Sequence, residues 1–468
     1  MRPLHLSTFV SSKSDKLLEH LGSLSKKYGA EGHTVLFALS SNIQPANCLG
    51  KAVDQLVNFN GVGPSVSSQG RVVGCLSDSL SSIKLFSERF GGSEVVSCSV
   101  AVLESKHCVP FYSPLPGRQK PQVGRWHSFR KINDAEDAGA LGVDQIDAAS
   151  GPGGQVNWEE VWNRSTGSST SAGLLLEALR SISPSDVHSL LHMSVLHPDL
   201  FLEGLSAGLP STTTLGLYAS PTHFITGRPV TLFLDDRIYG EGSVGVALLR
   251  DNDNEAAIPT SSTEFLEAKK LAEPMTVTSV EGNMVNALDN SNPTQLLLRA
   301  IQVGGISSPE TGPITSRTFK EDEEFALGVL SPTGKIIQAF KITAGDPAHR
   351  GGSISLDAIQ APAVGSTAQF LHHAATQSLR LPPSFLSQGF EKISFITTRE
   401  STMGHSISAD ELTQYPDSFI AEGTFLAGSH AGFVMSQGTL RSRVAKTSKD
   451  TWSCSLKGGM GVLEWPVE

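Results

Sequence analysis

The 468-residue sequence has few cysteines, and they show no spacing that marks a disulfide framework or a zinc site. The five are odd in number and scattered, without a CxxC pair: Cys48, Cys75, Cys98, Cys108 and Cys454. Disulfide scaffolds and structural zinc sites both need paired or clustered cysteines. We therefore expect reduced thiols in an intracellular protein, and we assign no metal-binding residue.

Long apolar runs and clusters of basic residues are also missing. No apolar stretch approaches the ~20 residues that a membrane-spanning helix requires. The formal net charge of -10 argues against a nucleic-acid groove, because neutralising phosphates takes clustered lysine and arginine. We therefore expect neither a membrane nor a nucleic acid as a partner.

The N-terminal segment lacks the apolar core of a secretory signal peptide. It is rich in serine and carries Arg2, Lys13 and Lys16, as transit peptides do, but it also contains Asp15 and Glu19, and transit peptides are poor in acidic residues. We expect a cytoplasmic protein, with the mitochondrion as the alternative.

Apolar periodicity predicts a mixed succession of helices and strands. The helices are expected at 15–28, 50–58, 172–182, 198–209, 294–303 and 370–379. The strands are expected at 35–39, 71–75, 94–103, 187–194, 215–219, 230–234, 238–239, 244–249, 275–281, 325–330, 335–342, 392–397, 424–428 and 432–435. Pro332 and Gly334 suit a hairpin turn between two of these strands. Asn292 and Pro293 suit the start of the helix at 294–303.

The chain is too long for one ordinary core, so we expect more than one domain. The polar stretch 250–263 separates a first lobe at 1–250 from a second lobe at 264–440, and 441–468 is predicted to be a C-terminal tail. Residues 109–170 are rich in proline and glycine and are predicted to form a partly disordered insertion. The predicted fold class is α+β, with two lobes that are each a mixed, largely antiparallel sheet flanked by helices.

Three motifs resemble known sites but fail in their context. Residues 240–245 match GxGxxG, yet they lie between two predicted strands, where no helix N-terminus can face a pyrophosphate. His188 and His192 would lie about 13 Å apart on a strand, too far to share a metal ion. Residues 404–408 lack the closing glycine of a nucleophile elbow. We therefore interpret the glycines as a turn and assign no catalytic residue.

Three of the predicted apolar strands end in small residues, at Gly74-Cys75, Ala219-Ser220 and Gly428-Ser429. This similarity leaves internal duplication open. Binding residues commonly lie in loops at strand ends, and an arginine beside a glycine turn, Arg228, suits a carboxylate held by two hydrogen bonds. The predicted ligand-binding residues are Cys75, Ser77, Ser220, Thr222, Thr226, Arg228, Ser429 and His430.

Several segments together resemble FIST-domain proteins of the fungal single-chain kind. They are VVGC at 72–75, LGLYASPTHFITGRPVTLF at 215–233, YGEGSVGVALL at 239–249, VEGNMVNALDNSNP at 280–293 and TFLAGSHAGF at 424–433. The resemblance covers most of residues 30–440 outside the insertion. It implies N-terminal and C-terminal halves that form an intracellular sensory domain for small ligands, and haem has been proposed as the ligand of some members.

The chain departs from two patterns of that family. An animal relative joins the domain to an F-box in a ubiquitin ligase, whereas fewer than about 35 residues precede the strand predicted at 35–39, which leaves little room for an F-box. Many relatives carry Gly-Glu in the final loop, where this chain has Gly432-Phe433. An acidic contact from that loop is therefore not carried over.

We expect a small-ligand-binding or sensory protein without catalytic activity. An amino acid or a small carboxylate is the expected kind of ligand, and no cofactor is assigned. One alternative is a substrate-recruiting adaptor in ubiquitin-dependent protein turnover, which would have protein partners. Another is a hydrolase, which would need a nucleophile, a base and oxyanion donors within about 3 Å of one another.

Overall fold

The computed structural model describes residues 2–29, 32–60, 70–115, 179, 182–250, 258–306, 323–345, 352–374, 378–386, 390–399, 416–436 and 451–466. The chain folds into several mixed sheets with few helices, so the predicted α+β class is confirmed. Within the described ranges, no helix is long and apolar enough to cross a membrane.

Three segments of the chain fold into the same three-stranded unit. In each, a central strand pairs in parallel with one later strand and antiparallel with another. In chain order, the first unit is β2 (Thr34–Ser40), β3 (Val72–Ser77) and β4 (Val96–Leu103), the second is β6 (Val187–Ser194), β7 (Thr213–Tyr218) and β12 (Ser243–Leu249), and the third is β21 (Phe390–Thr397), β23 (Thr424–Ser429) and β26 (Gly459–Pro466). This repeated pairing is what an internal duplication would produce.

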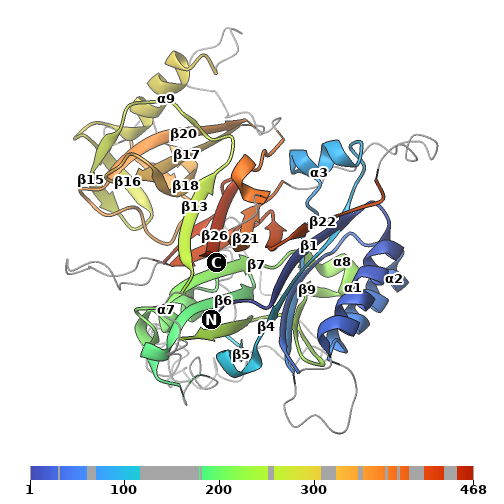
Figure 1. Ribbon diagram of the computed structural model, residues 1–468. Helices are drawn as coiled ribbons and strands as arrows, with labels where there is room; N and C mark the ends of the chain where they lie inside the picture. Colours follow the sequence, from blue (N-terminus) through green and yellow to red (C-terminus); the bar gives the residue numbers. More distant parts are fainter. Residues whose placement is uncertain are drawn as a thin grey trace, which may run out of the picture.

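The first unit is the centre of a seven-stranded sheet covered on one face by two helices (Figure 1). Its strands are, in spatial order, β11 (Arg237–Tyr239), β10 (Leu232–Leu234), β3, β2, β4, β1 (His5–Ser11) and β22 (Ser418–Glu422). The helices are α1 (Ser14–Tyr28) and α2 (Ala46–Val57), whose apolar faces pack on Phe37 and Phe233 of the sheet.

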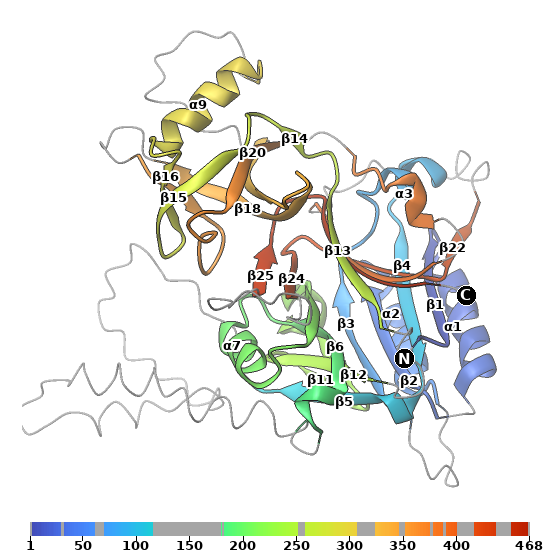
Figure 2. The ribbon, with the colours of Figure 1, turned by 60° about the vertical axis from the view of Figure 1, so that its left-hand side comes forward.

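The second unit is the centre of a six-stranded sheet. Its strands are, in spatial order, β25 (Thr451–Cys454), β24 (Phe433–Ser436), β7, β6, β12 and β5 (Cys108–Ser113). Helix α7 (Asp199–Gly208) packs on its outer face through Phe201. The inner faces of the two sheets share one core, which includes Val73 from the first sheet and Leu191 from the second. The layers therefore run helix, sheet, sheet, helix (Figure 2).

The third unit extends into a four-stranded sheet, and a barrel follows it in space (Figure 1). The sheet has the order β13 (Thr260–Phe265), β26, β21, β23. The barrel strands are β20 (Thr367–Ala374), β15 (Met275–Glu281), β16 (Met284–Leu288), β19 (Ile354–Leu356), β18 (Ile336–Gly345) and β17 (Glu323–Leu330), which pairs back with β20, while β14 (Lys269–Lys270) adds to β20. Helix α9 (Pro293–Val303) packs against the barrel, and the side chain of Asn292 caps it by accepting from Gln295 N at 3.0 Å.

The remaining short elements are α3 (Lys84–Arg89), β8 (Pro221–Thr222), α8 (His223–Thr226) and β9 (Arg228–Val230). Residues 240–242 form a turn between β11 and β12, as predicted, so the GxGxxG match meets no helix N-terminus. His188 and His192 lie on β6, also as predicted. All five cysteines are free thiols.

One predicted helix is wrong. Residues 367–374 form β20, where we expected a helix at 370–379. The apolar residues of this stretch have helical spacing, but β20 is buried on both faces, so it shows none of the alternation that marks a half-buried strand.

The predicted tail and lobe boundary also differ from the structure. Strands β25 and β26 come from the expected tail at 441–468, and each pairs within a sheet. Strands β22 and β24, from the expected second lobe, join the sheets of the first. Strand β5 lies inside the expected insertion and pairs with β12. Residues 116–178, which hold most of that insertion and the start of the helix expected at 172–182, lie outside the described residues.

Candidate functional site

In each unit one strand runs parallel to the central strand, and these three strands, β3, β7 and β23, end beside one another. Backbone hydrogen bonds join their ends: Ser220 N donates to Leu76 O at 3.1 Å, and Asp78 N donates to Gly428 O at 2.9 Å. Binding residues commonly gather at such strand ends in mixed sheets. We call this region the junction and define it by Asp78, Ser220, Thr398, Ser429 and His430.

A carboxylate and an imidazole from different units pair at the junction. His430 Nδ1 lies 2.7 Å from Asp78 Oδ2, and the backbone N–H of His430 donates to the same oxygen. Thr398 directly follows β21, and its Oγ1 also donates to this oxygen at 3.4 Å. The side chains of Asp78 and His430 are 19% and 25% exposed. The pair is thus largely desolvated and still reachable from solvent.

The surroundings of Asp78 favour its ionised form. Burial alone would raise the pKa of this carboxyl, but the hydrogen bonds and charge of His430, with a smaller contribution from Ser220, hold that pKa below its ordinary value. All three hydrogen bonds described above go to Oδ2, which leaves Oδ1 for Ser220 or for a donor from a ligand. The buried Ser220 hydroxyl makes no hydrogen bond of standard geometry within the described ranges, so its effect on Asp78 is one of proximity.

Three of the residues predicted from the sequence meet at the junction: Ser220, Ser429 and His430. Ser429 is fully buried, and its Oγ accepts a hydrogen bond from Ala431 N at 3.2 Å. This bond shapes the turn that presents His430. Ser77, also predicted, is buried at the end of β3 directly before Asp78, and its carbonyl accepts from Ser41 N at 2.9 Å. Ser77 therefore supports the junction through its backbone.

Cys75, another predicted contact, is not at the junction surface. Its side chain is fully buried in the core between the first two sheets. Burial, with the nearby charge of Asp78, raises the pKa of the Cys75 thiol far above its ordinary value. The thiol therefore stays protonated, and its role in this position is packing.

The remaining predicted residues form a separate cluster. Thr222 Oγ1 and Thr226 Oγ1 each lie 2.7 Å from Thr231 Oγ1, so the three hydroxyls brace the turn at α8. Arg228 is exposed on β9, and a Cβ placed on Gly240 would lie 3.3 Å from its aliphatic carbons. Among the described residues, the hydrogen bonds to Asp78 Oδ2 come from Thr398 and His430, and none comes from Arg228.

Two charged residues, Asp78 of the junction and Lys457 beside it, were not predicted from the sequence. Asp78 follows β3 in the GCLSDS segment, and a carboxylate directly after a buried strand was the signal available for it. Lys457 Nζ donates to His430 O at 2.8 Å, and its backbone N–H donates to Glu324 Oε2 at 3.2 Å. Lys457 lay in the expected tail, so its place beside His430 could not be inferred.

The junction has the groups to hold a polar ligand: an ionised carboxylate, an imidazole and a nearby ammonium group. A carboxylate that orients an imidazole also serves acid–base catalysis, but orientation alone supplies no nucleophile. No group of three or more His, Cys, Asp or Glu side chains that could hold a metal ion occurs in the part of the chain that the structure describes.

The fold and the junction together define an α+β protein built from three similar strand units around one polar strand-end site. No known protein-family model matches this chain, and no curated protein is significantly similar to it.

Proposed function

We propose that this chain binds a small polar ligand at the junction, as a binding or sensory protein without catalytic activity. The observation that carries the proposal is the Asp78–His430 pair, a partly exposed carboxylate–imidazole dyad formed where strands of all three units end. A dyad in a mostly buried position interacts more strongly with a charged ligand than a surface pair does, because less water screens it.

An amino acid or another small carboxylate fits the charges at the junction. A ligand ammonium or hydroxyl group would donate to Asp78 Oδ1, which receives none of the three bonds that hold Oδ2. A ligand carboxylate would be attracted to the Lys457 ammonium group, which lies against the His430 carbonyl. Each charge-assisted hydrogen bond of this kind contributes about 1.5–3 kcal/mol.

Thermal-shift screening of the chain against amino acids, small carboxylates and haem tests this proposal. We expect saturable stabilisation by at least one small polar compound. The variant His430→Gln should lose most of that shift, whereas His223→Gln, which changes an exposed histidine on α8, should keep it. The proposal fails if no compound stabilises the chain, or if both variants respond like the wild type.

A second candidate is an adaptor surface for a protein partner. It is favoured by Phe224 on α8, whose side chain is fully exposed at 105%, and by Ile225 beside it at 45%. Such apolar exposure at a turn is typical of contact surfaces. This candidate predicts that subunits of a ubiquitin ligase co-purify with the native chain and are lost with Phe224→Ser. Retention of the same subunits by that variant would exclude this surface.

A further inference from the structure

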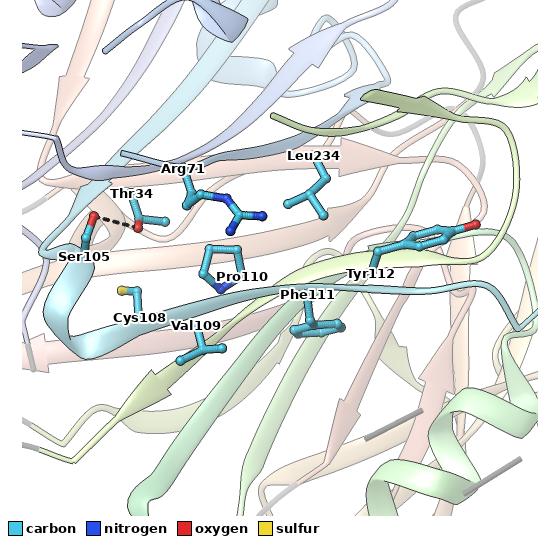
Figure 3. A pocket seen from close by; sticks show the side chains of 9 residues that line it. All are labelled: Thr34, Arg71, Ser105, Cys108, Val109, Pro110, Phe111, Tyr112 and Leu234. Atoms are coloured by element: carbon cyan, nitrogen blue, oxygen red, sulfur yellow. Dashed lines mark hydrogen bonds between the residues drawn. The ribbon is translucent and has the colours of Figure 1, made fainter. Parts of the chain in front are cut away.

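A cavity lies at the opposite end of β3 from the junction. Asp78 directly follows the last residue of β3, whereas Arg71 directly precedes the first. Arg71 lines a cavity of about 550 Å³ between β5 of the six-stranded sheet and the seven-stranded sheet that contains β3. Cavities that bind small molecules have volumes of roughly 300–1,000 Å³. The lining residues are Thr34, Arg71, Ser105, Cys108, Val109, Pro110, Phe111, Tyr112 and Leu234 (Figure 3).

Arg71 is held so that one edge of its guanidinium group remains for a ligand. Its Nε donates to Asp235 Oδ2 at 2.7 Å, and Asp235 is fixed because its Oδ1 accepts from Val72 N at 3.1 Å. The two Nη groups make no hydrogen bond to any other described residue. A guanidinium group binds a carboxylate through two parallel N–H donors. With Nε in use, the Nη pair is the edge that can do so.

The hydroxyl beside Arg71, that of Thr34, is not available to the same ligand. Ser105 Oγ donates its single proton to Gly32 O at 2.7 Å, so in its 3.0 Å contact with Thr34 Oγ1 the threonine must be the donor. Thr34 is also only 1% exposed, so its hydroxyl is not accessible to a ligand in the cavity. Val35 pairs with Val72 across the parallel strands, which puts Thr34 next to Arg71. Figure 3 shows both side chains on the same side of the cavity.

The rest of the cavity wall is apolar. Pro110 lies across from Arg71, and Leu234 lies beside the guanidinium group (Figure 3). Tyr112 stacks on Tyr239 with ring centroids 3.9 Å apart, which fixes one end of the wall. Pro110 lies on β5, an edge strand of its sheet, where a proline costs no ladder hydrogen bond. A ligand here would meet the donors of Arg71 and, beside them, a hydrocarbon surface.

We infer that this cavity binds a carboxylate with a compact apolar substituent. The carboxylate would lie on the two Nη groups of Arg71, and the apolar substituent would lie against Pro110 and Leu234. The inference does not depend on the junction, because the two sites share no residue and lie at opposite ends of β3.

Calorimetric titration with mandelate, mandelamide and phenylacetate tests this site. Mandelate should bind saturably with one molecule per chain. Mandelamide, which lacks the negative charge, should bind about tenfold more weakly or not at all, given the strength of charge-assisted pairs. Phenylacetate, which keeps the charge and the ring but lacks the hydroxyl, should bind with an affinity similar to that of mandelate, because the Thr34 hydroxyl is buried.

Variants locate the binding. Arg71→Lys keeps the charge opposite Asp235 but removes the two-donor edge, so it should weaken mandelate binding about tenfold. Arg237→Lys, a matched change at an exposed arginine on β11, should bind like the wild type, and so should Asp78→Asn at the junction. The inference is overturned if mandelate fails to saturate, if mandelamide binds equally well, or if Arg71→Lys retains wild-type affinity.

Discussion

The first and second units have the same strand pairing but differ in the ring at the middle of the central strand. In the first, Phe37 pairs with Gly74 of the parallel strand, and in the second His192 pairs with Gly216. A Cβ on Gly74 would lie 2.5 Å from the Phe37 ring, and one on Gly216 would lie 2.0 Å from the His192 ring. Each ring therefore fills the space that its glycine leaves open.

The two rings have the same packing role but different chemistry. Phe37 is fully buried in the core between the first sheet and helices α1 and α2. His192 is fully buried against Phe201 of α7, with ring centroids 5.0 Å apart, and neither of its ring nitrogens has a hydrogen-bond partner within the described residues. Burial lowers the pKa of His192 to about 3. The comparison teaches that one packing position accepts either a hydrocarbon or a neutral imidazole, and that only the imidazole responds to acid.

Truncating each ring gives the largest expected difference between the units. Phe37→Ala should reduce the free energy of unfolding by about 3–5 kcal/mol, the usual cost of removing a buried phenylalanine. His192→Ala should cost less, because the imidazole is buried with two unsatisfied nitrogens and removing it relieves that penalty. Urea denaturation of both variants at pH 7 measures the two costs. Equal costs would show that the polarity of the second ring has no energetic consequence.

Acid should destabilise the second unit through His192. In the unfolded chain this imidazole takes up a proton below pH 6.5, whereas in the folded chain it stays neutral until about pH 3. The unfolded state thus binds more protons, and stability falls as the pH drops through this window. At pH 5 the loss from this one residue is about 2 kcal/mol.

The variant His192→Phe copies the first unit into the second and isolates this term. Its free energy of unfolding should fall less than that of the wild type between pH 7 and pH 5, by about 2 kcal/mol. Some pH dependence should remain, because burial also lowers the pKa of His188 to about 3 and that of His373 to about 4. Identical pH profiles for the variant and the wild type would contradict a neutral, buried His192.

The smallest effect is expected at Arg228. Its side chain is exposed on β9, so Arg228→Ala should change the free energy of unfolding by no more than about 0.5 kcal/mol. It should also leave ligand binding at the junction unchanged. Thermal denaturation with and without ligand checks both outcomes. If Arg228→Ala lost the ligand-induced rise in melting temperature, the binding site would include the loop between β7 and β9.

Local signals in the sequence predicted much of the fold. The Asn292-Pro293 start of α9, the turn between β17 and β18, and the bounds of β15 all follow from residues close together in the chain. Strand β26 could not be predicted in the same way, because its partners β13 and β21 come from distant parts of the sequence. β20 was missed because burial on both faces removes the periodicity of a strand.

The candidate site was predicted only in part, for the same reason. Small polar residues at the ends of β7 and β23 predicted Ser220, Ser429 and His430 as site residues, and these three do lie together at the junction. The partner of His430 could not be read from spacing, because Asp78 lies 352 positions away along the chain. The sequence predicted that Arg228 binds a carboxylate. In the structure, the turn at Gly227, with a φ of 74°, leads the chain into β9, where Arg228 is exposed.

The central claim is that the Asp78–His430 pair binds a small polar ligand. Calorimetric titration of the compound with the largest thermal shift into the wild type, Asp78→Asn and Asp236→Asn tests it most directly, since Asp236 is an exposed carboxylate away from the junction. We predict that Asp78→Asn weakens binding at least about tenfold, as expected for a lost charge-assisted hydrogen bond, while Asp236→Asn binds like the wild type. Equal affinity of all three chains would contradict the account.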